Sequence, residues 1–168
     1  MPTGKKAQIS EFAETPLEGV NQILEIVNQP MPNVKTLGAT DVLIEVKSSA
    51  VGWVDLLMTS GQYQHQPPLP YTPGLEYCGV VSWIGAAVKN NTIKIGDKVM
   101  VDGFISGPRS PGKYQQYGGF ATYAVAPMEA IIPMPNRLSF DQACNLLGSY
   151  ETAYHCLCLL YTSPSPRD

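Results

Sequence analysis

Apolar and polar residues alternate over residues 41–47, which predicts a β-strand, because successive side chains of an extended chain point to opposite faces. One face would carry Val42, Ile44 and Val46, and the other Leu43, Glu45 and Lys47. Further short apolar runs bounded by Gly, Pro and Asp predict strands over residues 78–84, 98–103, 118–126 and 130–133. The pattern therefore indicates a mainly β chain with many turns.

Helical signals are fewer and two of them are clear. Residues 52–61 carry apolar side chains at helical spacing and predict a short helix. A convincing helix start follows at Ser139, with Gln142 three residues later, the arrangement of a capping box. Between the first helix and the second strand, prolines at positions 67, 68, 70 and 73 predict a rigid extended loop over residues 64–73.

Composition fits a single turn-rich globular domain. The chain has 168 residues, 44% of them hydrophobic, with 15 Gly and 15 Pro. Only 15% of the residues are charged and the net charge is -3, without a run of Lys or Arg, so neither nucleic acid nor an anionic membrane is an expected partner.

The sequence also predicts a cytoplasmic protein. The residues after Met1 do not form the apolar stretch of a secretory signal, and no apolar run reaches the length of a membrane-spanning helix. The four cysteines lie in apolar surroundings and are not spaced as a disulfide framework, which favours a reducing compartment.

The stretch from Tyr71 to Val101 carries the most specific motif. Its turn and strand residues follow a fixed order: Pro73-Gly74, Glu76, Gly79, the apolar run that Gly85 closes, and Ile95-Gly96-Asp97 before a second strand. This stretch resembles the N-terminal, chaperonin-10-like domain of medium-chain dehydrogenases/reductases. The resemblance extends to four more blocks, at residues 50–55, 60–63, 118–123 and 133–144, and to the helix start Thr152-Ala153-Tyr154.

The resemblance implies a fold and a domain division. The fold is a partly open, chaperonin-10-like β-barrel followed by one or two helices, over residues 1–157. The family's dinucleotide-binding Rossmann domain is expected to be absent, because no G-x-G-x-x-G occurs. Residues 158–168 follow no family pattern, and their two Ser-Pro steps oppose a continuing helix, so they are expected to be an unrelated, disordered tail.

Metal ligands of the zinc-dependent branch are missing from the sequence. At the positions where that branch would carry Cys and His, this chain has Gly52-Trp53 and Leu75, and residues 101–116 contain no Cys for a structural zinc lobe. The pair Cys156-x-Cys158 beside His155 is a weak counter-signal. We therefore predict no metal site and the zinc-free quinone oxidoreductase branch.

The branch implies NADPH as the hydride donor and a quinone or an α,β-unsaturated carbonyl as the acceptor. Tyr63 matches the family Tyr near nicotinamide and substrate, so it is the predicted catalytic and cofactor-contacting residue. Thr152 is the second predicted cofactor contact. For each, the alternative is structural: a Tyr packed under the Pro-rich loop, and a Thr that caps or decorates a helix. The resemblance also implies a homodimer for the complete enzyme.

Three acidic residues are expected to be structural in the main. Glu76 would hold backbone groups or an Arg, with a catalytic role as the alternative. Asp55 would cap the first helix, with a position near the substrate as the alternative, and Asp97 would accept amides of its own turn. Gly52 stands where many relatives have Asn, which removes a polar contact to the cofactor. Two functions remain open: the substrate-side half of a quinone or enone reductase, and a non-enzymatic fragment that acts only as a binding module.

Overall fold

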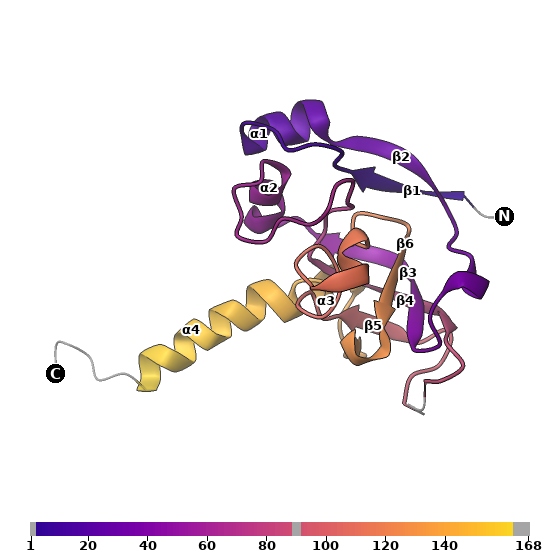
Figure 1. Ribbon diagram of the computed structural model, residues 1–168. Coiled ribbons are helices and arrows are strands. Elements are labelled where there is room, and N and C mark those ends of the chain that lie inside the picture. Colours follow the sequence, from indigo (N-terminus) through magenta and orange to yellow (C-terminus); the bar gives the residue numbers. More distant parts are fainter. Residues whose placement is uncertain (1–2, 89–91, 163–168) are drawn as a thin grey trace.

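A curled antiparallel sheet forms the centre of the computed structural model, which describes residues 3–88 and 92–162 (Figure 1). The five strands are ordered β6-β3-β4-β5-β7, and a separate pair, β1-β2, packs beside them. The strands are β1 (Thr3–Gln8), β2 (Glu25–Pro30), β3 (Asp41–Ala50), β4 (Glu76–Ile84), β5 (Lys98–Val101), β6 (Tyr123–Pro127) and β7 (Ile131–Pro133).

Helical segments are short except for the last one. They are α1 (Pro16–Glu18), η1 (Gly19–Ile23), η2 (Val34–Thr36), α2 (Trp53–Thr59), η3 (Gly112–Gln116), η4 (Met128–Ala130), α3 (Phe140–Ala143), η5 (Leu146–Tyr150) and α4 (Glu151–Thr162). The mixed β and α content and the half-barrel sheet, followed by α3 and α4, confirm the predicted fold class.

Strand β3 is the longest strand and has neighbours on both sides, β4 and β6. The predicted alternation is present, since Val42 and Ile44 belong to one apolar cluster and Leu43 to another. All three side chains are fully buried, with 0% exposure. The second cluster is covered by Tyr114 and Tyr117 from the loop after β5.

Strand β1 forms backbone hydrogen bonds with residues 120–122, just before β6, and so extends the curl of the sheet. Ala7 N–H donates to the Phe120 carbonyl at 2.8 Å, and the Thr122 N–H donates to the Lys5 carbonyl at 2.8 Å. This segment is not the strand predicted over residues 118–126, because the regular strand begins only at Tyr123. A side chain at Gly118 would overlap the Thr72 carbonyl, and the N–H groups of Gly119 and Phe120 donate to the carbonyls of Gly74 and Pro73, so residues 118–120 pair with the turn at position 73.

Strand β5 and helix α4 also end at other residues than the sequence predicts. Strand β5 ends at Val101, because Asp102 turns the chain and accepts the Phe104 N–H at 2.8 Å. Helix α4 continues past Leu157 to Thr162 and projects away from the barrel in Figure 1. Residues 163–168, with both Ser-Pro steps of the predicted tail, lie outside the described residues.

The capping box at Ser139 is confirmed. Its hydroxyl accepts from the Gln142 N–H, and the Gln142 side chain accepts from the Ser139 N–H. The Asp97 turn is also as predicted, with the Lys94 N–H donating to the Asp97 carboxylate at 2.8 Å.

Candidate active-site cleft

A cleft of about 780 Å³ opens where the sheet meets the C-terminal helices. Its walls come from the start of α2, the start of β4, the loop after β5, and the segment from η5 into α4. A volume of this size is typical of a pocket for a small molecule or a cofactor end. Three large aromatic side chains line it while remaining largely exposed: Trp53 (68%), Phe104 (62%) and Tyr154 (70%).

Asp55 fixes the α2 wall. One of its oxygens accepts the N–H of the N-cap residue Gly52 at 3.0 Å, and the other accepts the amides of Gly74 and Leu75 at 3.0 and 3.1 Å. Burial raises the pKa of this carboxyl and outweighs the opposing effect of the three amide donors. Asp55 thus joins α2 to the turn before β4, which is the structural role expected for it.

Glu76 joins β4 to the C-terminal segment. Its two oxygens accept the hydroxyl and the N–H of Ser149, both at 3.0 Å. Gly148 precedes this contact, and a side chain there would overlap the Glu76 carboxylate. The small residue therefore allows η5 to approach β4, and Glu76 holds backbone, which is one of the two structural roles predicted for it.

The loop after β5 brings Arg109 to the cleft. The Arg109 guanidinium lies 3.7 Å from the centre of the Phe104 ring, the geometry of a cation–π contact. The loop is anchored at its other end by Asp41, which accepts the Tyr114 hydroxyl at 2.6 Å and the Lys113 ammonium at 3.0 Å. The sequence analysis did not single out Arg109. The signal that could have indicated it is that one of the three arginines of the chain lies in a turn-rich segment.

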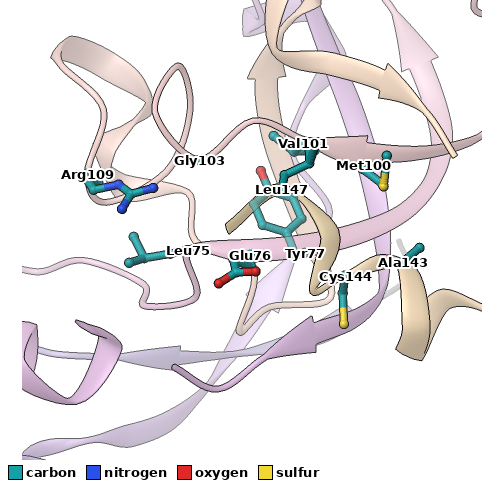
Figure 2. A pocket seen from close by; sticks show the side chains of 10 residues that line it. All are labelled: Leu75, Glu76, Tyr77, Met100, Val101, Gly103, Arg109, Ala143, Cys144 and Leu147. Atoms are coloured by element: carbon teal, nitrogen blue, oxygen red, sulfur yellow. The ribbon is translucent and has the colours of Figure 1, made fainter. Parts of the chain in front are cut away.

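A small cavity of about 10 Å³ lies next to the cleft, with room for about one water molecule (Figure 2). Arg109, Leu75, Glu76 and Leu147 line both spaces. Figure 2 shows the Arg109 side chain on the side of the cavity where Leu75 and Glu76 lie. The guanidinium is therefore placed where the floor of the cleft meets the core.

The structure separates the two site residues predicted from the sequence. Thr152 is exposed on the first turn of α4 and lines the cleft. Tyr63 is half-buried, packs on the cluster of Ile9, Met58, Tyr71 and Leu75, and has its ring 5.9 Å from that of His65. It is not among the described residues that line the cleft. Its predicted contact with substrate stays a prediction.

Residues 3–88 and 92–162 contain no group of three or more His, Cys, Asp or Glu side chains that could hold a metal ion. Cys78 and Cys144 are buried thiols, and Cys156 and Cys158 are exposed. Within the same ranges, no helix has the length and apolar character needed to cross a membrane.

Residues 38–136 match the model of the alcohol dehydrogenase GroES-like domain. The chain belongs to this family. Its curated relatives place it in the quinone oxidoreductase-like branch of the medium-chain dehydrogenases/reductases, as predicted from the motifs. Human quinone oxidoreductase, for example, is 34% identical over 116 residues, a match that covers 69% of this chain and 31% of that protein.

Solved structures agree with the family assignment. The quinone oxidoreductase of Coxiella burnetii superimposes with a TM-score of 0.73 at 27% identity, covering 98% of this chain and 47% of that one. A mycobacterial structure complexed with NADPH gives a TM-score of 0.70 at 25% identity, covering 97% of this chain and 43% of that one. The GroES-like chain thus spans about a third of the length of the curated relatives that it matches.

Proposed function

We propose that this chain is the substrate-side domain of an NADPH-dependent, zinc-free quinone or enone oxidoreductase. The observation that carries the proposal is the aromatic-lined cleft beside Thr152, in a domain whose relatives are quinone oxidoreductases. We further propose that the complete enzyme is a cytoplasmic homodimer.

The residues present fit only one end of the cofactor. Thr152 and Ser149 offer polar groups on the wall of the cleft, and its volume could hold a nicotinamide ring beside an acceptor. The described residues contain no glycine-rich turn between a strand and a helix that would bind the pyrophosphate. When bound, NADPH would supply the hydride, and the rest of its binding site would come from the dinucleotide-binding domain that the family has.

The chain's own contribution would be binding and orientation. Trp53 and Phe104 would contact the faces of a planar acceptor, and Thr152 would meet the nicotinamide end of the cofactor. Tyr63 would donate a hydrogen bond to the acceptor carbonyl, whose oxygen becomes more negative as hydride arrives. The proton that completes the reduction would come from solvent.

Zinc has no place in this proposal. The positions that would carry ligands hold Gly52, Trp53 and Leu75, none of which can bind a metal ion. Without a metal to polarise the substrate, hydrogen-bond donors must stabilise the developing oxyanion, so a conjugated carbonyl is a better substrate class than an alcohol.

A second candidate function is a non-enzymatic binding module. All side chains of residues 151–158 are exposed, and the large apolar residues Tyr150, Tyr154 and Leu157 are each more than 60% exposed, being 63%, 70% and 62%. An apolar helical surface of this kind is typical of an interface. In this alternative the chain would bind a partner through η5 and α4 without catalysis.

The two candidates are separated by joining this chain, within α4, to the dinucleotide-binding domain of human quinone oxidoreductase. The chimera should oxidise NADPH when 1,4-naphthoquinone is added, and a chelator should not change the rate. Tyr63→Phe should lower kcat by about tenfold and leave the KM for NADPH nearly unchanged, because the lost hydrogen bond forms mainly in the transition state.

Thr152→Val should instead raise the KM for NADPH, because it removes a cofactor contact and leaves the acceptor side intact. A folded chimera that binds NADPH but reduces no quinone or enone would refute the enzymatic proposal and favour the binding module. An unchanged rate in Tyr63→Phe would return that residue to its packing role.

A further inference from the structure

The Arg109 guanidinium is a positive charge without a partner in the described chain. It makes no hydrogen bond and no ion pair with residues 3–88 or 92–162, and its Nε is buried and unsatisfied. Among the described residues it makes a cation–π contact with Phe104, whose ring centre lies 3.7 Å from the guanidinium carbon. Arg109 as a whole is half-buried, so its terminal nitrogens, which have no acceptor among the described residues, are the donors that a ligand in the cleft can reach.

The acidic side chains nearby do not fill that role. Both oxygens of Asp55 accept backbone amides, and both oxygens of Glu76 accept from Ser149. Asp102 accepts the Phe104 N–H. These three and the exposed Glu151 line the cleft together with Arg109, yet none of the four forms an ion pair with the guanidinium within 4.0 Å.

The stack on Phe104 also shapes the site. Arg109 covers one face of the ring, which holds Phe104 in place at the end of the short turn begun by Asp102. Phe104 remains 62% exposed, and Trp53, 68% exposed, lines the same cleft from α2. A flat aromatic ligand can therefore cover apolar surface here while its edge reaches a cationic donor.

We propose that Arg109 and Phe104 form the recognition site for a planar, fused-ring aromatic acceptor that carries an anionic oxygen, such as a carboxylate. The anionic oxygen would accept from the guanidinium, and the ring would pack against Phe104. Because the cleft otherwise carries carboxylates, an anion is favoured only where it contacts Arg109 directly. This assignment rests on the proposed function and names the substrate class for the same cleft.

The test uses the 168-residue chain itself, without cofactor, and two probes with the same ring system: anthraquinone-2-carboxylate and 2-(hydroxymethyl)anthraquinone. Their dissociation constants are measured by quenching of tryptophan fluorescence and by amide chemical-shift changes. The wild type should bind the carboxylate about tenfold tighter than the neutral probe, the effect of one charge-assisted hydrogen bond.

Arg109→Met keeps much of the length and apolar packing of the side chain, and it should remove this preference or reverse it. Arg109→Lys keeps the charge and should retain part of the preference. Phe104→Leu should weaken both probes alike. Arg137→Met is the matched control, since Arg137 is exposed and not among the residues that line the cleft, and it should bind both probes like the wild type.

Binding of both probes with equal affinity to wild type and Arg109→Met would overturn the assignment of Arg109 while leaving the substrate-side cleft intact. Absence of binding of either probe to the folded wild type would overturn both the assignment and the proposed function. A preference for the carboxylate that survives in Arg109→Met would place the anion elsewhere and also refute the inference.

Discussion

Replacing Asp41 with Asn should destabilise the domain, because this carboxylate anchors the loop that carries Phe104 and Arg109. Asp41 is only 3% exposed. It accepts the Gly38 N–H at 2.8 Å, the Tyr114 hydroxyl at 2.6 Å and the Lys113 ammonium at 3.0 and 3.1 Å. Asparagine has a similar shape but no charge, and its amide group would face donors where the carboxylate accepts.

The size of the expected destabilisation depends on how exposed each hydrogen-bond partner of Asp41 is. Hydrogen bonds to a charged group contribute about 1.5–3 kcal/mol each, although Asn would keep one acceptor oxygen. The Lys113 side chain is 59% exposed, so its ion pair with Asp41 adds only about 0.5 kcal/mol. We expect Asp41→Asn to cost about 2–3 kcal/mol in the free energy of unfolding.

The dependence on pH has a definite sign. Burial alone would raise the pKa of Asp41, but the hydrogen bonds from Tyr114, Lys113 and the Gly38 amide outweigh it and hold the pKa below its ordinary value of 3.8. The unfolded chain therefore binds the proton more readily. The stabilisation is complete above the unfolded pKa of about 4 and is lost as the pH falls through the lower, folded pKa.

Urea unfolding followed by far-ultraviolet circular dichroism measures the effect. At pH 7 the midpoint of Asp41→Asn should fall by about 1 M or more, for a slope of about 2 kcal/mol per M. Tyr114→Phe should cost about 1 kcal/mol and Lys113→Met about half of that. The difference in unfolding free energy between the wild type and Asp41→Asn should become smaller below about pH 4. If Asp41→Asn lowers the unfolding free energy by less than about 0.5 kcal/mol at pH 7, or if its difference from the wild type grows in acid, the anchoring role is refuted.

Three further predictions concern the rest of the fold. Gly148→Ala should break the contact of Glu76 with the C-terminal segment, because the added methyl group would overlap the carboxylate. Amide hydrogen exchange should then become faster at residues 148–150 and stay unchanged in β4. Alkylation at pH 8 should modify Cys156 and Cys158, which are exposed, well before Cys78, since burial raises the pKa of that thiol to about 12; rapid loss of the Cys78 thiol in the native protein would contradict its burial. The purified chain should contain far less than one equivalent of zinc by elemental analysis, and a chelator should not shift Tm; tightly held, stoichiometric zinc would overturn the zinc-free assignment.

The sequence predicts local structure correctly where a single short segment determines that structure. The alternation over residues 41–47 and the spacing of Ser139 and Gln142 each set a local structure, and the strand and the capping box are present. The motif from residue 71 to 101 indicated the family, because its turns and strands follow one another closely along the chain.

Only the tertiary structure decided which distant residues share the cleft. Trp53, the pair Phe104 and Arg109, and Thr152 come from three segments, and no periodicity along the chain relates a loop after β5 to the first turn of α4. Tyr63, ten residues after Trp53 in sequence, packs instead on the apolar cluster of Ile9, Met58, Tyr71 and Leu75. The position of Arg109 depends on a stack on Phe104 within the same loop and on an anchor at Asp41, which forms only when the sheet brings β3 beside the loop. A sequence pattern reports the conformation of its own segment, whereas a binding site depends on packing between segments that are far apart along the chain.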